Sequence, residues 1–437
     1  MDKRTRKAIF YSLCALFAAA GTFVVLYAQG WRLDFETFGF QKVGGVYLRS
    51  FPKDAGIFLN GKYVDKNPGL LDSGRFISNL FPKNYKLKLS GDGYLDWTEN
   101  IQVAPSLVTE LKYAVLIPKN QEDAYRGFVK DFYADNDQLI INSGTSLLFG
   151  GKKIKGDKVV FQNGDSKTAL TENTGAGTYF INYFNGNTPT STNLNPKLTN
   201  YGIEPSNIKE IIKDPGSANT AIFRTGSRVF YLNIQTGEVS ALALSSQTIT
   251  NIAASPSWIA WINFDQKSGK SKISFYNRSS NSVQNETEIS GTASKISFGK
   301  ENTIGILQDD GGFYVASPES KPQKMAGSVR DFSFSKNGTL VSLLEPQTIE
   351  IFAFNNEKDY WRFRLPDVGT IERAEWYGDE NHLFIMYPGE IKFLDLNDKS
   401  IENFPTVASG NQPVYDIKSN TLYFIKNELL RKLVFPK

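Results

Sequence analysis

The chain opens with an apolar run that is long enough to cross a membrane. Residues 8–31 include no charged side chain, and a helix of about 20 residues spans the ~30 Å hydrocarbon core of a bilayer. Four basic residues within 1–7 precede the run, and basic flanks stay in the cytoplasm. The pattern predicts a cytoplasmic basic tail at 1–7, a single transmembrane helix at 8–31 that contacts lipid through residues 8–28, and extracytoplasmic domains after it.

A cleaved signal peptide is the alternative interpretation of this segment. Small residues at 18–20 suit a cleavage site, and residues 8–17 suit its apolar core. The apolar run continues through residues 23–26, however, whereas the apolar region of a signal peptide usually ends before its cleavage site. We therefore expect the segment to remain attached to the chain as an anchor in the cell membrane.

Short apolar or alternating runs separated by Gly, Pro and Asn follow a linker at 32–43. Alternation of apolar and polar residues is typical of half-buried strands, and no run in this segment keeps helical periodicity over more than two turns. Asn60-Gly61 is a strong hairpin signal, because a type I′ turn needs positive φ at both central positions. These patterns predict a small β-sandwich at 44–118.

Several motifs follow one another over about 70 residues of this segment: Gly45-Val46-Tyr47-Leu48, Pro52-Lys53-Asp54-Ala55, Ile57-Phe58-Leu59-Asn60-Gly61, Asn67-Pro68, Pro82-Lys83-Asn84-Tyr85-Lys86-Leu87 and Gly93-Tyr94. In that order and spacing the segment resembles the PEGA domain of bacterial and archaeal envelope proteins. It departs from the family where Lys53-Asp54 replaces Glu-Gly, where Leu59-Asn60 replaces Val-Asp, and where Asn84 replaces Gly. The resemblance implies an immunoglobulin-like extracytoplasmic module with an adhesive or spacer role and no catalytic residues. Turn chemistry alone also accounts for these Gly, Pro and Asn positions.

A strand pattern returns about every 40 residues over 125–437, and such a period is typical of propellers. A second apolar strand follows each recurring strand, and a run such as 331–338 precedes several of them. Three or four strands per repeat correspond to one blade. The first apolar residues of the recurring strand are Leu139, Phe180, Ile222, Ile259, Ile304, Leu340, Leu383 and Leu422. The pattern predicts a β-propeller of seven or eight blades, and an all-β protein apart from its anchor.

The run 331–338 resembles the repeats of WD40-like and TolB-like propellers, although it lacks their Trp-Asp signature. The last unit, 412–437, has room for only three strands, and a strand before residue 128 would complete it and remove an exposed edge. Seven blades result if the irregular units at 125–210 merge. Asn, Thr and Ser are frequent at 171–200, Asn182, Asn185 and Asn187 among them, and we expect a long loop insertion there.

Composition and charge narrow the function classes. With 41% hydrophobic and 13% aromatic residues, the chain is globular and not low-complexity. The net charge is +4, of which residues 1–7 supply +3. The remaining chain is nearly neutral, which argues against nucleic-acid binding, because that affinity comes from concentrated Lys and Arg.

The single cysteine, Cys14, and the single histidine, His382, exclude disulfides and Cys/His zinc sites. Cys14 is expected to be a buried structural thiol, not a site of lipid attachment. A catalytic triad would have to be centred on His382. His382, however, stands directly before Leu383, as Thr421 stands before Leu422, so we expect a turn residue and not a base.

Carboxylate pairs lie in predicted polar turns, where solvated charge is the expected role and a calcium site is the alternative. These pairs are Asp135 with Asp137, Asp309-Asp310 and Asp379-Glu380. No phosphate-binding glycine loop and no nucleophile elbow is present in the sequence, which argues against nucleotide chemistry. Most of Trp258, Trp261, Trp361 and Trp376 are expected in the core.

Two function classes remain. One is an anchored envelope protein that is not an enzyme and whose propeller binds another envelope protein or a cell-surface glycan, with loops such as 182–200 at the contact face. The other is a propeller hydrolase or lyase that acts on polysaccharide through Asp and Glu. We expect the first, with no catalytic residue, no cofactor and no metal; the sequence leaves the binding residues open.

Overall fold

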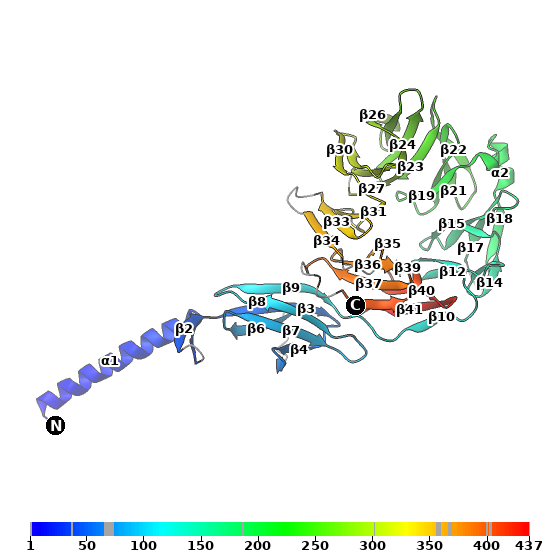
Figure 1. Ribbon diagram of the computed structural model, residues 1–437. Helices are drawn as coiled ribbons and strands as arrows, with labels where there is room; N and C mark the ends of the chain where they lie inside the picture. Colours follow the sequence, from blue (N-terminus) through cyan, green and yellow to red (C-terminus); the bar gives the residue numbers. More distant parts are fainter. Residues whose placement is uncertain are drawn as a thin grey trace. The chain divides into compact units, whose positions relative to one another are not determined.

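Residues Lys3–Ala28 form helix α1 in the computed structural model (Figure 1). The helix is long and apolar enough to cross a membrane, which confirms the predicted N-terminal apolar helix. It ends before the predicted residue 31, because Gly30 adopts φ +86° and its N–H bonds to the carbonyl of Tyr27. The prediction of a buried Cys14 thiol is wrong: the side chain is exposed on α1, which packs none of its residues into a protein core.

The structure describes residues 2–35, 38–64, 74–185, 188–300, 302–354, 360–365, 369–398, 401 and 404–436. The chain divides into two units, Met1–Asn120 with Phe435–Lys437, and Gln121–Val434. Asn67-Pro68 and Asn187 of the sequence analysis lie outside the described residues.

Within the segment predicted as a linker, 32–43, the chain forms paired strands. Strand β1 (Trp31–Asp34) pairs with β2 (Gly39–Lys42) in an antiparallel register that places Leu33 opposite Phe40. Residues alternate between the two faces of such a hairpin, so a short amphipathic sheet follows directly on α1.

Seven strands in two sheets follow the hairpin in the first unit, in the orders β6-β3-β9 and β5-β4-β7-β8. The strands are β3 (Gly44–Phe51), β4 (Gly56–Leu59), β5 (Lys62–Val64), β6 (Arg75–Leu80), β7 (Asn84–Ser90), β8 (Trp97–Gln102) and β9 (Val108–Val115). Asn60 and Gly61 both have positive φ, 48° and 79°, and join β4 to β5, which confirms the predicted hairpin.

One apolar core holds the two sheets together. Val46 and Leu48 from the first sheet and Leu87, Leu89 and Ile57 from the second are at most 1% exposed and belong to the same cluster. Alternate residues of β7 point into this core, as the burial of every second residue of the strand shows.

The described part of the second unit forms eight antiparallel sheets of four strands, and seven of them consist of four consecutive strands. Those seven sheets are β11 (Asp131–Asp135), β12 (Gln138–Asn142), β13 (Leu147–Phe149), β14 (Lys152–Ile154); β15 (Lys158–Asn163), β16 (Thr168–Asn173), β17 (Thr178–Tyr183), β18 (Thr190–Asn193); β19 (Glu210–Lys213), β20 (Thr220–Arg224), β21 (Arg228–Asn233), β22 (Val239–Leu244); β23 (Ile249–Ala254), β24 (Trp258–Asp265), β25 (Lys270–Asn277), β26 (Ser282–Ser290); β27 (Ala293–Phe298), β28 (Ile304–Gln308), β29 (Phe313–Ser317), β30 (Ser320–Ala326); β31 (Asp331–Phe334), β32 (Leu340–Leu344), β33 (Thr348–Ala353), β34 (Tyr360–Arg364); and β35 (Arg373–Trp376), β36 (His382–Tyr387), β37 (Glu390–Asp395), β38 (Thr406–Ser409). The eighth sheet contains β39 (Asn411–Asp416), β40 (Thr421–Lys426), β41 (Leu429–Val434) and β10 (Glu122–Tyr125).

The first strands of the sheets contact one another in cyclic order. β11 contacts β15, each later first strand contacts the next, and β39 returns to β11. In Figure 1 the sheets accordingly follow one another around a common centre. Apolar clusters fill the space between neighbouring sheets, such as the cluster of β20, β21, β23 and β24 residues around Ile222, Ile259 and Trp261.

The last sheet is completed by the start of the unit, as predicted for a strand before residue 128. β10 pairs with β41, so that Glu122 lies opposite Lys432 and Asp123 opposite Arg431. The same partners form ion pairs. Strands from the two ends of the unit therefore share one sheet.

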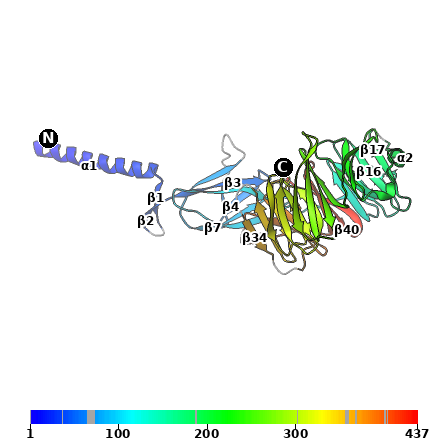
Figure 2. The same ribbon diagram turned by 90° about the horizontal axis from the view of Figure 1, so that it is seen from above.

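One alternative and one expectation about residues 125–210 do not hold. The units there do not merge, because β11–β14 and β15–β18 are separate sheets. Residues 171–200 are also not a loop insertion: they include β17, β18 and the short helix α2 (Asn195–Asn200). Figure 2 shows α2 beside β17, and its Leu198 packs in one cluster with Ile181. The polar composition does not indicate a loop here, because Asn182 and Thr171 are buried within strands, and Nδ2 of Asn182 donates to Oγ1 of Thr171 at 2.7 Å.

We predict that Leu430 on β41 is essential to the closure of the ring. It is fully buried and clusters with Val129, Phe132 and Ile141, which lie next to or within the first sheet. Leu430→Ala should lower the free energy of unfolding of this unit by about 3 kcal/mol, because it leaves a cavity. Val434→Ala on the same strand, where the side chain is 47% exposed, should change it by less than about 0.5 kcal/mol. Equal unfolding midpoints for the two variants in a urea titration would contradict the proposed role.

Candidate functional site

His382 is the first residue of β36 and is 1% exposed. Its Nδ1 lies 2.7 Å from Oδ2 of Asp379, and its Nε2 lies 3.6 Å from Oδ2 of Asp395. The ring also stacks on Phe393, with 4.7 Å between centroids. The prediction of a turn residue is therefore wrong, because the imidazole enters the core between two carboxylates.

The electrostatics of this cluster favour a charged imidazole. Burial lowers the pKa of His382, but the carboxylates of Asp379 and Asp395 outweigh burial and raise the pKa to about 9. The same contact holds the pKa of Asp395 below its usual range, against the opposing effect of its own burial. Since the ring is enclosed, it offers no surface to a substrate.

The carboxylates predicted to be solvated in turns hold neighbouring sheets together instead. Asp135 accepts a hydrogen bond from the N–H of Gly164 at 3.0 Å, and Glu380 accepts one from the N–H of Asn337 at 2.8 Å. The N–H of Asp137 donates to Asp416 at 3.0 Å. These links join the turns between the first and second strands of adjacent sheets.

The other candidates from the sequence lie in a turn or pack in or against the core. Asp310 accepts a hydrogen bond from the N–H of Gly312 within its own turn. Trp258, Trp261 and Trp376 are at most 8% exposed, which confirms their place in the core, and Trp361 packs half-buried against a neighbouring core cluster. Among the residues that the structure describes, no group of three or more His, Cys, Asp or Glu side chains is placed to hold a metal ion.

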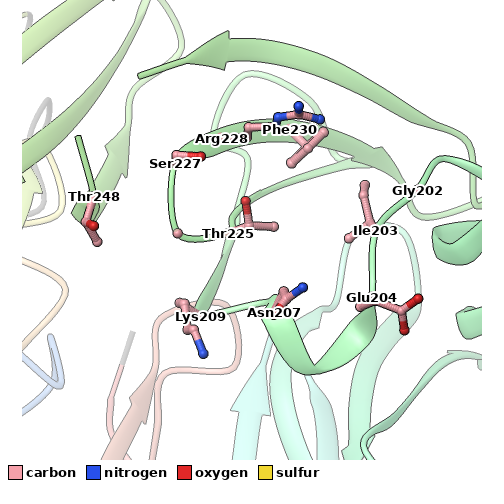
Figure 3. A pocket seen from close by; sticks show the side chains of 11 residues that line it. Gly202, Ile203, Glu204, Asn207, Lys209, Thr225, Ser227, Arg228, Phe230 and Thr248 are labelled. Carbon is pink, nitrogen blue, oxygen red and sulfur yellow. The ribbon is translucent and has the colours of Figure 1, made fainter. Parts of the chain in front are cut away.

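A pocket of about 570 Å³ opens at one end of the β19–β22 sheet (Figure 3). Its walls come from the segment after α2, from the turn that joins β20 to β21, and from the approach to β23. The lining residues are Gly202, Ile203, Glu204, Asn207, Lys209, Thr225, Gly226, Ser227, Arg228, Phe230 and Thr248. The predicted contact loop 182–200 supplies none of these described lining residues.

Backbone hydrogen bonds fix the walls of this pocket. The N–H of Thr225 donates to the carbonyl of Arg228 at 2.9 Å and closes the β20–β21 turn. The N–H of Ile249 donates to the carbonyl of Gly226 at 2.7 Å and ties that turn to the next sheet. The N–H of Asn207 donates to the carbonyl of Glu204 at 2.9 Å in the short helix η1 (Pro205–Asn207). The pocket is therefore formed by ordered backbone.

Arg224 holds the strands beneath the pocket. Its Nε donates to Oε2 of Glu210 at 2.8 Å, and its Nη1 donates to the carbonyl of Ile249 at 2.7 Å. Glu210 also accepts from the N–H of Ile252 at 3.3 Å. One partly buried ion pair therefore connects β19, β20 and β23, whose ends carry Lys209, Thr225 and Thr248.

The lining is polar and has an excess of positive charge. Lys209 and Arg228 are exposed, and neither forms an ion pair with a residue that the structure describes. Glu204 is the one carboxylate among the lining residues, and hydroxyl groups stand between the charges. Phe230, the one aromatic in the lining, is 5% exposed and stacks on Phe223, so it offers no open ring face. The arrangement suits a polar ligand that carries negative charge.

Two further pockets lie in the same unit. One of about 550 Å³ includes Asp214, which makes two hydrogen bonds to Arg278 at 2.6 and 3.0 Å and is 3% exposed. The other, of about 450 Å³, includes Asp131 and Asp157. Each of the last two carboxylates accepts a hydrogen bond from a backbone N–H.

No protein-family model matches the chain, and a search of curated proteins finds no match to it.

Sequence reasoning missed the pocket because its residues are separated by up to 46 positions and carry no motif. The one local signal is Thr225-Gly226-Ser227, a tight turn between two predicted strands. That turn alone does not show that Lys209 and Arg228 line one pocket, since this depends on the pairing of β19 with β20.

We predict that the stability of the second unit depends on pH through His382. The folded protein binds the proton up to a pKa of about 9, whereas the unfolded chain releases it near 6.5. His382 therefore contributes about 3 kcal/mol to the free energy of unfolding below pH 6.5, and this contribution is lost as the pH rises toward 9. Urea unfolding of the second unit at a series of pH values measures the slope.

His382→Leu should remove this slope and destabilise the unit at about pH 6, because it leaves the buried Asp395 and the partly buried Asp379 without their partner. Lys321→Leu, at an exposed position on β30, is the control and should keep the slope. A wild-type stability that is flat between about pH 6.5 and 9 would show that the imidazole is neutral in the folded state.

Proposed function

We propose that this protein is a membrane-anchored, extracytoplasmic binding protein that is not an enzyme. In this proposal α1 spans the cell membrane once with its basic end in the cytoplasm. The two sheets of the first unit serve as a PEGA-like spacer, and the second unit is an eight-bladed β-propeller that binds an envelope protein. Each element of the proposal has separate support.

The anchor is supported by the length and the apolar composition of α1 and by the four basic residues at its start. The spacer is supported by two sheets around one core and by the motif order that the sequence shares with PEGA domains. Its turn residues Asn60 and Gly61 have the φ values that such a hairpin needs.

The propeller is supported by three observations. Sheets of four antiparallel strands repeat along the second unit. Their first strands contact one another in a cycle, and a strand from the start of the unit completes the last sheet. A propeller has these properties, because each blade packs on two neighbours and the closed cycle leaves only short, protected strand edges.

The pocket with Lys209 and Arg228 is the observation that supports binding most directly. Two cations without a described acidic partner remain solvated in the free protein and are available to a carboxylate. Hydroxyl groups and the backbone of the fixed β20–β21 turn add neutral hydrogen-bonding groups. We infer that the partner presents an acidic protein segment to this pocket.

A glycan ligand and a glycan-cleaving enzyme fit this pocket less well. Neutral sugars are commonly held by an open aromatic face, and Phe230 is buried against Phe223. Hydrolysis of a glycosidic bond uses two carboxyl groups that flank the bond. The described lining has only Glu204.

Binding of acidic peptides tests this function. The full chain in detergent is applied to an array of ten-residue peptides that carry central Asp or Glu residues, together with the same peptides with Asn or Gln in their place. We expect binding that depends on the acids and weakens from about 50 mM to about 300 mM salt. Lys209→Ala with Arg228→Ala should weaken it about tenfold or more.

Lys321→Ala with Arg330→Ala removes the same charge from exposed positions outside the pocket and should leave binding unchanged. Equal loss in both double variants would show that only net charge matters, and the pocket would not be the site. Turnover of polysaccharide substrates that disappears in Asp131→Asn or Asp157→Asn would replace the binding function with the hydrolase.

A further inference from the structure

The hairpin β1–β2, which we call the aromatic hairpin (described residues 31–35 and 38–42), exposes several large apolar side chains. Leu33 is 39% exposed, Phe35 75%, Phe38 85% and Phe40 52%. Four large apolar residues within such a short segment form an exposed patch of the kind that marks a protein or membrane contact. A two-stranded sheet of this size is also marginally stable in water by itself.

The two faces of the aromatic hairpin differ. Trp31 lies opposite Lys42, and Leu33 lies opposite Phe40. Because side chains alternate along a strand, these four residues share one face. The other face is polar: Arg32 lies opposite Gln41, and Nε2 of Gln41 donates to Oδ2 of Asp34 at 3.1 Å. The hairpin is therefore amphipathic, with its cation Lys42 on the apolar face at 5.5 Å from the Trp31 ring.

The chain connects this hairpin closely to the end of α1. β1 begins three residues after Ala28, a distance of at most about 10 Å along the chain. Nη1 of Arg32 donates to the carbonyl of Tyr27 at 2.7 Å, and the guanidinium lies 3.5 Å from the centre of the Tyr27 ring. The N–H of Val43 donates to the carbonyl of Gly30 at 3.0 Å. Both ends of the hairpin are thus bound to the last turn of α1 and the residues that follow it.

We propose that the apolar face and the phenylalanines of the aromatic hairpin lie in the outer leaflet at the boundary between headgroups and acyl chains. This inference rests on the proposed anchor, because a spanning α1 places Tyr27 and the start of β1 at that boundary. Aromatic rings are favoured there, and Lys42 and Arg32 bring positive charge close to lipid phosphates. The bilayer then covers the apolar face, and the hairpin limits how far the first unit tilts on its anchor.

Fluorescence quenching in liposomes tests the position of the hairpin. Cys14 is the one cysteine of the chain, so Cys14→Ser gives a background into which single cysteines are introduced. Phe35→Cys carries an environment-sensitive thiol probe on the full-length protein, and Leu244→Cys, at a 72% exposed position in the second unit, is the matched control. The wild-type protein labelled at Cys14 reports on α1. Quenchers are lipid with a doxyl group near the headgroup or deep in the chain, and aqueous iodide.

We expect the probe at position 35 to be quenched by the shallow doxyl lipid and to be at least threefold less accessible to iodide than the probe at position 244. Leu33→Ser with Phe40→Ser removes the apolar pair. The probe at position 35 should then be as accessible to iodide as the probe at position 244. Tyr63 and Phe76 are exposed aromatics of the first unit outside the hairpin. Tyr63→Ser with Phe76→Ser should leave the position-35 probe quenched by the shallow doxyl lipid.

The outcomes separate the two proposals. If Cys14 is quenched by deep doxyl lipid while position 35 behaves like position 244, the anchor stands and the hairpin proposal is wrong. If iodide quenches Cys14, the anchor is wrong and the hairpin proposal fails with it. Circular dichroism of each variant checks that the β structure is unchanged.

Discussion

Pairing of β10 with β41 gives the last sheet of the second unit its fourth strand. The pairing brings the first and last residues of the unit into one sheet, where Glu122 and Asp123 form ion pairs with Lys432 and Arg431. Leu430 then packs against the first sheet. The cycle of contacts between first strands is complete with this last sheet in place, because β39 contacts both β35 and β11.

Polar links between turns join neighbouring sheets in addition to the apolar packing. Asp135, Asp416 and Glu380 each accept a backbone hydrogen bond from a neighbouring sheet, and Arg224 connects three strands under the pocket. Buried or partly buried links of this kind need a fixed geometry to offset the loss of hydration. They tie the sheets of the second unit to one another, and the strands that Arg224 connects end at the pocket residues Lys209, Thr225 and Thr248.

The strand repeat was predictable because alternating apolar residues and polar turns are local signals. Seven of the eight aligned residues, Leu139 and Leu422 among them, lie in the second strand of a sheet. Phe180 lies in a third strand, because the polar residues of β16 hide the true second strand. His382 was misjudged for a related reason: its partners Asp379 and Asp395 meet it only through the β36–β37 pairing and the turn before it. The pocket could not be predicted from the sequence, because Lys209, Arg228 and Thr248 line it together only through contacts between strands.

Hydrogen exchange of the amides in residues 122–125 tests the closed ring most directly. In a closed ring these amides belong to a sheet with β41, so they should exchange about as slowly as those of β40, at least a hundredfold slower than an unstructured segment. Exchange of residues 122–125 at the rate of a free chain, with β40 still protected, would mean that the last sheet has three strands and that the ring is open.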